Sequence, residues 1–120
     1  MKDAVTMELK TDKMIARKED GVGWLTFNNP ARLNAVSLVM WEGVAEAMDN
    51  FAADDDIRLV VLAGAGDRAF VSGADISEFA ENRNSAASEE RYSAASASAH
   101  RAMAGFEKPL LAMIQGYCIG

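Results

Sequence analysis

Two uninterrupted apolar runs constrain what this chain can fold into. They are Leu59–Ala63 and Leu110–Ile114, and they are separated by more than forty residues. An apolar run without alternation is typical of a strand that is covered on both faces, as in a parallel sheet. Parallel strands need long crossovers, which usually contain a helix. We therefore expect both runs to be buried strands of an α/β fold with parallel pairing and right-handed crossovers.

The N-terminal third contains signals for a hairpin. Met14–Arg17 and Val22–Phe27 are expected to form two short strands. Asp20-Gly21 lies between them, and this dipeptide is typical of a tight hairpin turn. Asn28-Asn29-Pro30 is expected to end the second strand, because proline cannot donate to a ladder and asparagine favours turns.

Two segments have the character of helices. Ser37 is a candidate N-cap for a helix that reaches about Ala53, because apolar residues recur there at helical spacing. The alanine content predicts a second helix from about Ser88 to Phe106. Residues 1–12 are expected to be a flexible tail before a single domain at 13–120, and the polar stretch around 82–90 is expected to be mobile.

Composition excludes several classes of partner. The chain has 120 residues, with 18 acidic and 12 basic side chains and a net charge of −6. This balance argues against nucleic acid and anionic membrane surfaces as partners, since both reward clustered Lys and Arg. The N-terminus has no apolar signal region, and no apolar run approaches the roughly 20 residues that span a bilayer. The single cysteine, Cys118, cannot form an internal disulfide, so we expect a cytoplasmic protein with Cys118 as a small core residue.

The first candidate functional motif is Ser72-Gly73-Ala74-Asp75-Ile76. Its small residues allow another backbone or a ligand to approach closely. An outward N–H at Ala74 could donate a hydrogen bond to an oxyanion, while Asp75 caps a short helical stretch. An ordinary strand-to-helix turn would have the same residue types, and that alternative stays open at this point.

The second motif is Gly116-Tyr117-Cys118-Ile119-Gly120, which follows the last predicted strand. A strand that enters a glycine turn often leads to a helix N-terminus, where free backbone N–H groups can hold an anion. Two such donors on adjacent turns would form an oxyanion hole. Considered alone, this segment also fits a plain turn.

The third motif is Asn28–Ala35. Arg32 could hold a phosphate there, and Ala35 leaves room for a flat group. A surface loop with one solvated arginine is the competing interpretation. His100 is the only histidine, and its alanine- and serine-rich surroundings favour a residue on the surface of a helix.

Taken in order, these motifs resemble the enoyl-CoA hydratase/isomerase (crotonase) superfamily. The matching stretches are Trp24–Pro30 with Leu33-Asn34-Ala35, Leu59–Gly64, Ala69–Ile76, and Lys108-Pro109 followed by Gln115–Gly120. The resemblance runs from about Met14 to the last residue and covers the N-terminal portion of the family's domain. It implies a spiral of ββα units that binds acyl-coenzyme A thioesters.

The resemblance also implies roles for individual residues. Ala74 would supply the first oxyanion-hole N–H, and Gly120 would lie at the edge of the turn that supplies the second. Coenzyme A, which is part of the substrate, would be the only ligand, without a separate cofactor or a metal. Residues implied to contact it are Arg32, Ala35, Ser72, Gly73, Asp75, Ile76, Tyr117 and Ile119.

The implied activity depends on residues beyond this sequence. Hydratases of the family use two glutamates as general base and acid, and both would follow the glycine turn. An isomerase, a hydrolase or a dehalogenase of the same superfamily is the alternative. We expect the 120-residue chain by itself to be inactive, to bind coenzyme A at most, and to self-associate, whereas the family forms trimers or dimers of trimers.

Overall fold

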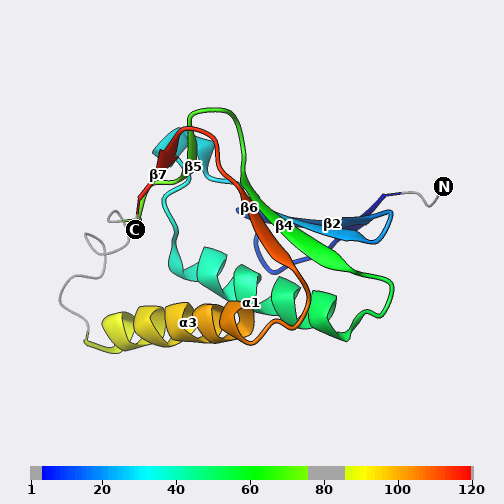
Figure 1. Cartoon of the computed structure of the whole chain (residues 1–120). Helices are drawn as coiled ribbons and strands as arrows, with labels where there is room; N and C mark the ends of the chain where they lie inside the picture. The colour runs from blue at the N-terminus through cyan, green and yellow to red at the C-terminus, as the bar shows by residue number, and fades with distance from the viewer. Residues whose placement is uncertain (1–3, 76–85, 120) are drawn as a thin grey trace.

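The computed structural model describes residues 4–75 and 86–119. It is an α/β structure in which one sheet is covered on one face by a helix, and a second helix packs on the first (Figure 1). The five-stranded sheet has the order β1 (Val5–Met7), β2 (Met14–Glu19), β3 (Val22–Phe27), β4 (Leu59–Gly64) and β6 (Leu110–Met113). Strands β5 (Ala69–Val71) and β7 (Tyr117–Cys118) form a separate two-stranded sheet. Ile76 and Gly120, both candidate site residues, lie outside the described residues. So do residues 82–85 of the stretch expected to be mobile, whereas residues 86–90 belong to helix α3 (Ala86–Ala104).

The predicted hairpin is confirmed. Strands β2 (Met14–Glu19) and β3 (Val22–Phe27) pair antiparallel around Asp20 and Gly21. Both turn residues have positive φ, 51° and 82°, as a tight hairpin with native twist requires. Strand β1 (Val5–Met7) adds to β2, so part of the segment expected to be a flexible tail belongs to the sheet.

The predicted parallel pairing is also confirmed. Strand β4 (Leu59–Gly64) runs parallel to β3, and β6 (Leu110–Met113) runs parallel to β4. Helix α1 (Leu38–Ala53) connects β3 to β4, and helix α3 (Ala86–Ala104) precedes β6. Ser37 caps α1 as predicted, because its side chain accepts a hydrogen bond from the N–H of Met40.

The core lies between the sheet and α1. The inward residues of β3 alternate with the outward ones, so that Leu25 and Phe27 face the helix. Gly23 continues the same face, where a Cβ would lie 2.9 Å from the Phe51 ring of α1. This close approach lets Phe51 pack flat on the sheet without any exposure. Helix α3 covers the far side of α1, and of its described residues only Ala99 is buried.

The predicted burial of the last strands is wrong. Strand β6 is the edge of the five-stranded sheet, and β7 (Tyr117–Cys118) is the edge of the small one. The part of the chain that the structure describes has no element beyond them, so their side chains stay in solvent. Cys118 is exposed rather than part of the core. Five apolar side chains in this segment are more than half exposed: Leu111, Met113, Ile114, Tyr117 and Ile119.

Candidate active site

The candidate site lies where three chain segments meet at one end of the large sheet. They are the loop after β3, the end of β5 (Ala69–Val71), and β7. In Figure 1 the loop and the two-stranded sheet lie together, away from the hairpin turn. The chain passes through this region three times, so residues that are far apart in sequence become neighbours.

The loop after β3 is held by its own asparagines. Proline at position 30 begins a short 3-10 helix, η1 (Pro30–Arg32), and Leu33 and Asn34 then adopt left-handed backbone conformations. The Asn29 side chain donates to the Ala35 carbonyl at 2.9 Å. The carbonyl of Asn29 accepts from the N–H of Asn34 at 2.8 Å. These bonds fix a compact loop in which Ala35 is buried.

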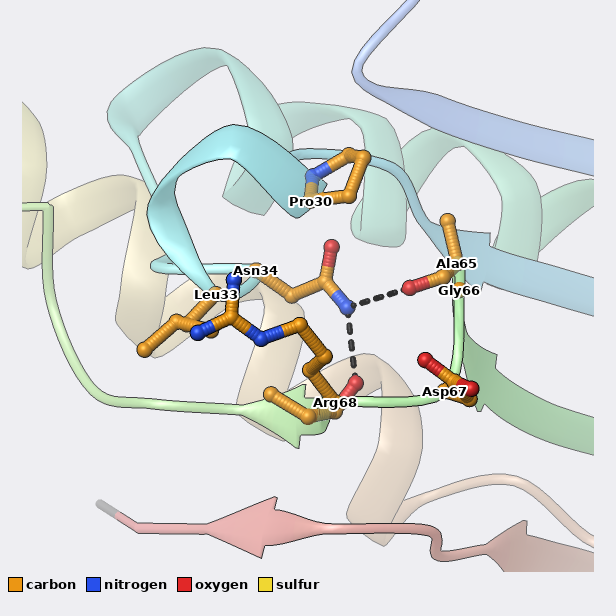
Figure 2. Close-up of a pocket in the computed structure, with 8 residues that line it drawn as sticks. Pro30, Leu33, Asn34, Ala65, Gly66, Asp67 and Arg68 are labelled. Carbon is orange, nitrogen blue, oxygen red and sulfur yellow. Dashed lines mark hydrogen bonds between the residues drawn. The ribbon is translucent and has the colours of Figure 1, made fainter.

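Asn34 connects this loop to the start of β5. Its side chain is 1% exposed, and its Oδ1 accepts from the N–H of Asn29 at 2.9 Å. Its Nδ2 donates to the carbonyls of Ala65 and Ala69 at 3.1 and 2.8 Å (Figure 2). A carboxamide satisfies a donor and an acceptor at once, which explains why this residue type suits a buried junction. In the sequence, Asn34 belongs to the third motif, but we predicted no role for its side chain.

A small pocket of about 80 Å³ opens beside Asn34. It is lined by the loop and by the turn before β5: Pro30, Leu33, Asn34, Ala65, Gly66, Asp67, Arg68 and Ala69. Figure 2 shows the Arg68 side chain extending across it toward Leu33. None of the candidate site residues from the sequence lines this pocket, so it is an adjoining feature rather than the candidate site.

The geometry around Ala74 singles out its N–H group. Val36 forms a parallel bridge with Ala74, in which Val36 donates to the Gly73 carbonyl at 2.8 Å and accepts from the N–H of Asp75 at 3.0 Å. In a parallel bridge these bonds go to the residues on either side of the bridged one. The Ala74 N–H is therefore directed away from Val36. Among residues 4–75 and 86–119 it has no acceptor, and Ala74 is exposed.

The second motif lies directly beside the first. Strand β7 pairs parallel with β5, and Tyr117 donates to the carbonyl of Arg68 at 3.0 Å. Ile119 donates to the carbonyl of Val71, again at 3.0 Å. The end of β7 thus reaches the residues that immediately precede Gly73 and Ala74. The strands that precede the two candidate donor motifs are therefore adjacent.

Arg32 and Ser72 also meet. The Ser72 hydroxyl donates to the carbonyl of Arg32 at 3.4 Å, while the Arg32 side chain is exposed. Gly73 has φ +112°, and no atom lies within 4 Å of where its Cβ would be. Glycine is therefore required there by backbone conformation alone. The side chains of Tyr117 and Ile119 are exposed. Asp75 is buried, and its N–H donates to the Val36 carbonyl.

Outside these motifs, the described residues offer few candidate catalytic or metal-binding groups. His100 is exposed on α3, as predicted, and its ring lies 4.9 Å from the ring of Trp41. Among residues 4–75 and 86–119, no group of three or more His, Cys, Asp and Glu residues is placed to hold a metal ion. No helix within those ranges is both long and apolar enough to cross a membrane.

The five-stranded sheet with helix α1, together with the adjacent parallel strands β5 and β7, defines an α/β protein. The family model described as enoyl-CoA hydratase/isomerase matches residues 22–120. The chain belongs to this family. The resemblance seen in the sequence is thereby confirmed, and so is the crotonase fold of the N-terminal portion.

Known relatives agree with this assignment. A short-chain-enoyl-CoA hydratase of Clostridium acetobutylicum is 29% identical over 112 residues, which are 93% of this chain and 42% of the relative. The mitochondrial 3-hydroxyisobutyryl-CoA hydrolase of Rattus norvegicus is 28% identical over 92% of this chain and 29% of its own. A solved structure from Magnetospirillum magneticum, described as an enoyl-CoA hydratase/carnithine racemase, is 36% identical with a TM-score of 0.81. It is matched over 89% of this chain and 40% of its own.

The chain therefore spans less than half the length of these relatives. The relatives also differ in the reaction that their names give, since one is a hydratase and another a hydrolase.

Proposed function

We propose that this chain binds an acyl-CoA thioester and that the Ala74 N–H donates a hydrogen bond to the thioester oxygen. The observation that carries the proposal is the direction of this N–H, which the bridge to Val36 leaves free for a ligand. An enolate concentrates negative charge on one oxygen, and fixed backbone donors stabilise it without reorganising. The residue after Gly120 would be the second donor, a proposal supported by the pairing of β7 with β5, the strand that precedes Ala74.

The coenzyme A portion of the ligand would lie along the same edge. Ser72, Gly73, Asp75 and Ile76 would offer backbone contacts to its adenine end, with Ala35 forming part of that pocket. Arg32, whose main-chain carbonyl accepts from Ser72, has an exposed side chain, which suits a phosphate contact. Such a local cation matters in a chain of net charge −6, because the ligand is an anion. Tyr117 and Ile119 would line the side nearer the second donor.

For the whole protein we propose a cytoplasmic hydratase-type reaction on a short enoyl-CoA, in a trimer of the kind the family forms. The chemistry would need no separate cofactor, because the thioester itself activates the reacting carbons once its oxygen is held. The glutamates that move protons in the hydratases would come from residues beyond 120. For residues 1–120 alone we expect binding without measurable turnover of crotonyl-CoA.

Titration with crotonyl-CoA and with free coenzyme A tests the binding proposal. The expected result is a selective shift of the Ala74 amide resonance with crotonyl-CoA and not with coenzyme A. Ala74→Pro removes the donor, and the Val36 bridge uses only Gly73 and Asp75, so its hydrogen bonds can persist. We expect this variant to lose the preference for the thioester, whereas Ala74→Ser, which keeps its N–H, retains it. Equal affinity of both ligands for the unmodified chain, with Ala74 unperturbed, would refute the proposal.

A further inference from the structure

A tyrosine in α3 connects the two helices to the strand end that carries Ala74. The indole Nε1 of Trp41, in α1, donates to the Tyr92 hydroxyl oxygen at 3.0 Å. The Tyr92 hydroxyl in turn donates to the carbonyl oxygen of Val36 at 3.1 Å. An indole can only donate and a carbonyl can only accept, so in these two bonds the hydroxyl accepts from Trp41 and donates to Val36. The direction of the whole relay is therefore fixed by residue type.

The Val36 carbonyl is the acceptor that matters for the candidate site. It accepts two hydrogen bonds, one from the Tyr92 hydroxyl and one from the N–H of Asp75 at 3.0 Å. Through its own N–H, Val36 also donates to Gly73. Val36 is buried, and it thus holds the residues on both sides of Ala74. The Val36 N–H holds the Gly73–Ala74 peptide, which carries the Ala74 N–H, and the Val36 carbonyl holds the next peptide, Ala74–Asp75.

We propose that Tyr92 is a positioning residue that sets the direction of the Ala74 N–H through the Val36 carbonyl. This inference rests on the proposed function, because a set direction is useful only if that N–H meets a ligand. A carbonyl with one donor can swing about that bond, whereas two donors on its two lone pairs fix its plane. The indole of Trp41 polarises the hydroxyl and strengthens the bond to Val36.

The competing explanation is that Tyr92 simply joins α3 to α1. Such a hydrogen bond would contribute to stability, and its loss would change the packing between α1 and α3. It would not act on Ala74 and Asp75 in particular, since both lie outside α1 and α3. Amide resonances in the free protein separate the two explanations.

Tyr92→Phe in the full 120-residue chain is the deciding variant. We expect the amide resonances of Ala74 and Asp75 to shift and the exchange of the Asp75 N–H with solvent to quicken by about threefold to tenfold, as for one lost hydrogen bond. Affinity for crotonyl-CoA should fall by a similar factor, while affinity for free coenzyme A should change less than about twofold. Ser93→Ala removes a hydroxyl from the exposed neighbouring position and should change none of these.

Unchanged Ala74 and Asp75 resonances in Tyr92→Phe, with a shifted Trp41 indole resonance, would overturn the inference. If that variant does not fold, Trp41→Phe decides, because it keeps the Tyr92 bond to Val36 but removes the donor that orients it. A smaller shift at the same two amides is then expected, and no shift there overturns the inference. These spectra need no ligand, so failure of crotonyl-CoA to perturb Ala74 would reject the proposed function separately.

Discussion

The N–H of Ile119 donates to the carbonyl of Val71 across 3.0 Å. This bond brings the end of β7 beside the end of β5, so that the two glycine-containing motifs become neighbours. A site with two backbone donors requires this adjacency, because each donor comes from a different strand end.

Gly116, which immediately precedes β7, packs tightly against the backbone of Arg68, which immediately precedes β5. It has φ +76°, and a Cβ there would lie 2.1 Å from the carbonyl oxygen of Arg68. Gly116→Ala should therefore destabilise the fold by about 3 kcal/mol or more, because backbone must move as well as adopt a strained φ. Gly66→Ala is the matched control, since Gly66 has the same φ of +76° without a close backbone atom.

Gly66→Ala should lower the free energy of unfolding by only about 1 kcal/mol, because it introduces the unfavourable backbone conformation without a clash. Denaturant unfolding gives both values, and hydrogen exchange at the Tyr117 amide reports whether β7 has left β5. Equal losses for the two variants would mean that the clash with Arg68 is relieved easily, contrary to the close packing seen here.

Asn34 is expected to be the polar residue whose loss costs most. Asn34→Ala leaves the carbonyls of Ala65 and Ala69 and the N–H of Asn29 without their partner in a buried place. We expect a loss of about 2–4 kcal/mol in the free energy of unfolding. Asn50→Ala, at an exposed position of α1, is the control and should be nearly neutral. A loss below about 1 kcal/mol for Asn34→Ala would show that the junction does not depend on this side chain.

Lys108 caps the C-terminus of α1. Its ammonium donates to the carbonyls of Phe51 and Asp54, each at 2.7 Å. A cation at this end of a helix satisfies free carbonyls and opposes the helix dipole. Lys108→Met should lower stability by about 1–2 kcal/mol, measured by thermal or denaturant unfolding. Lys13→Met, at an exposed position, should change it little, and equal effects would argue against the cap.

Acid should weaken the end of α1. The hydrogen bond from Lys18 to the Asp54 carboxylate, with help from the N–H of Asp56, lowers the Asp54 pKa below its ordinary value of 3.8. A lowered pKa in the folded state means stability that is present above the ordinary pKa and is lost as the pH falls through the folded value. Asp54→Asn should therefore reduce the loss of stability as the pH falls below the ordinary value of 3.8.

The matched control for this acid effect is Asp55→Asn, which makes the same change in charge at an exposed neighbour. Unfolding curves at several pH values should show a shallower acid slope for Asp54→Asn than for the control. The same slope in both variants would mean that the Lys18 bond does not survive in solution.

The exposed apolar edge should cause association. Leu111, Met113 and Ile114 lie in or next to β6 and are more than half exposed, and β6 is an edge strand. Such edges pair with other chains. We expect the mass measured by analytical ultracentrifugation to rise with concentration, and Leu111→Lys with Ile114→Lys to suppress this rise. Val39→Lys, on α1, is the control that should not, and a monomer at all concentrations would contradict the prediction.

The sequence by itself determined the features that depend on near neighbours. Asp20-Gly21 predicted the hairpin, Ser37 predicted the start of α1, and the apolar run Leu59–Ala63 predicted a parallel strand, because turns, caps and periodicity are local. The ordered motifs also predicted the family and the adjacency of the two strand ends. The described part of the fold follows these signals closely.

Only the tertiary structure decided which distant groups meet and which side chains stay in water. Asn34 bonds to Ala69 across 35 positions, and Tyr92 reaches Val36 across 56. The apolar run Leu110–Ile114 has the composition of a buried strand, yet it lies at an edge and is mostly exposed. A local pattern records what a strand can bury, whereas the packing of other segments determines whether anything covers it.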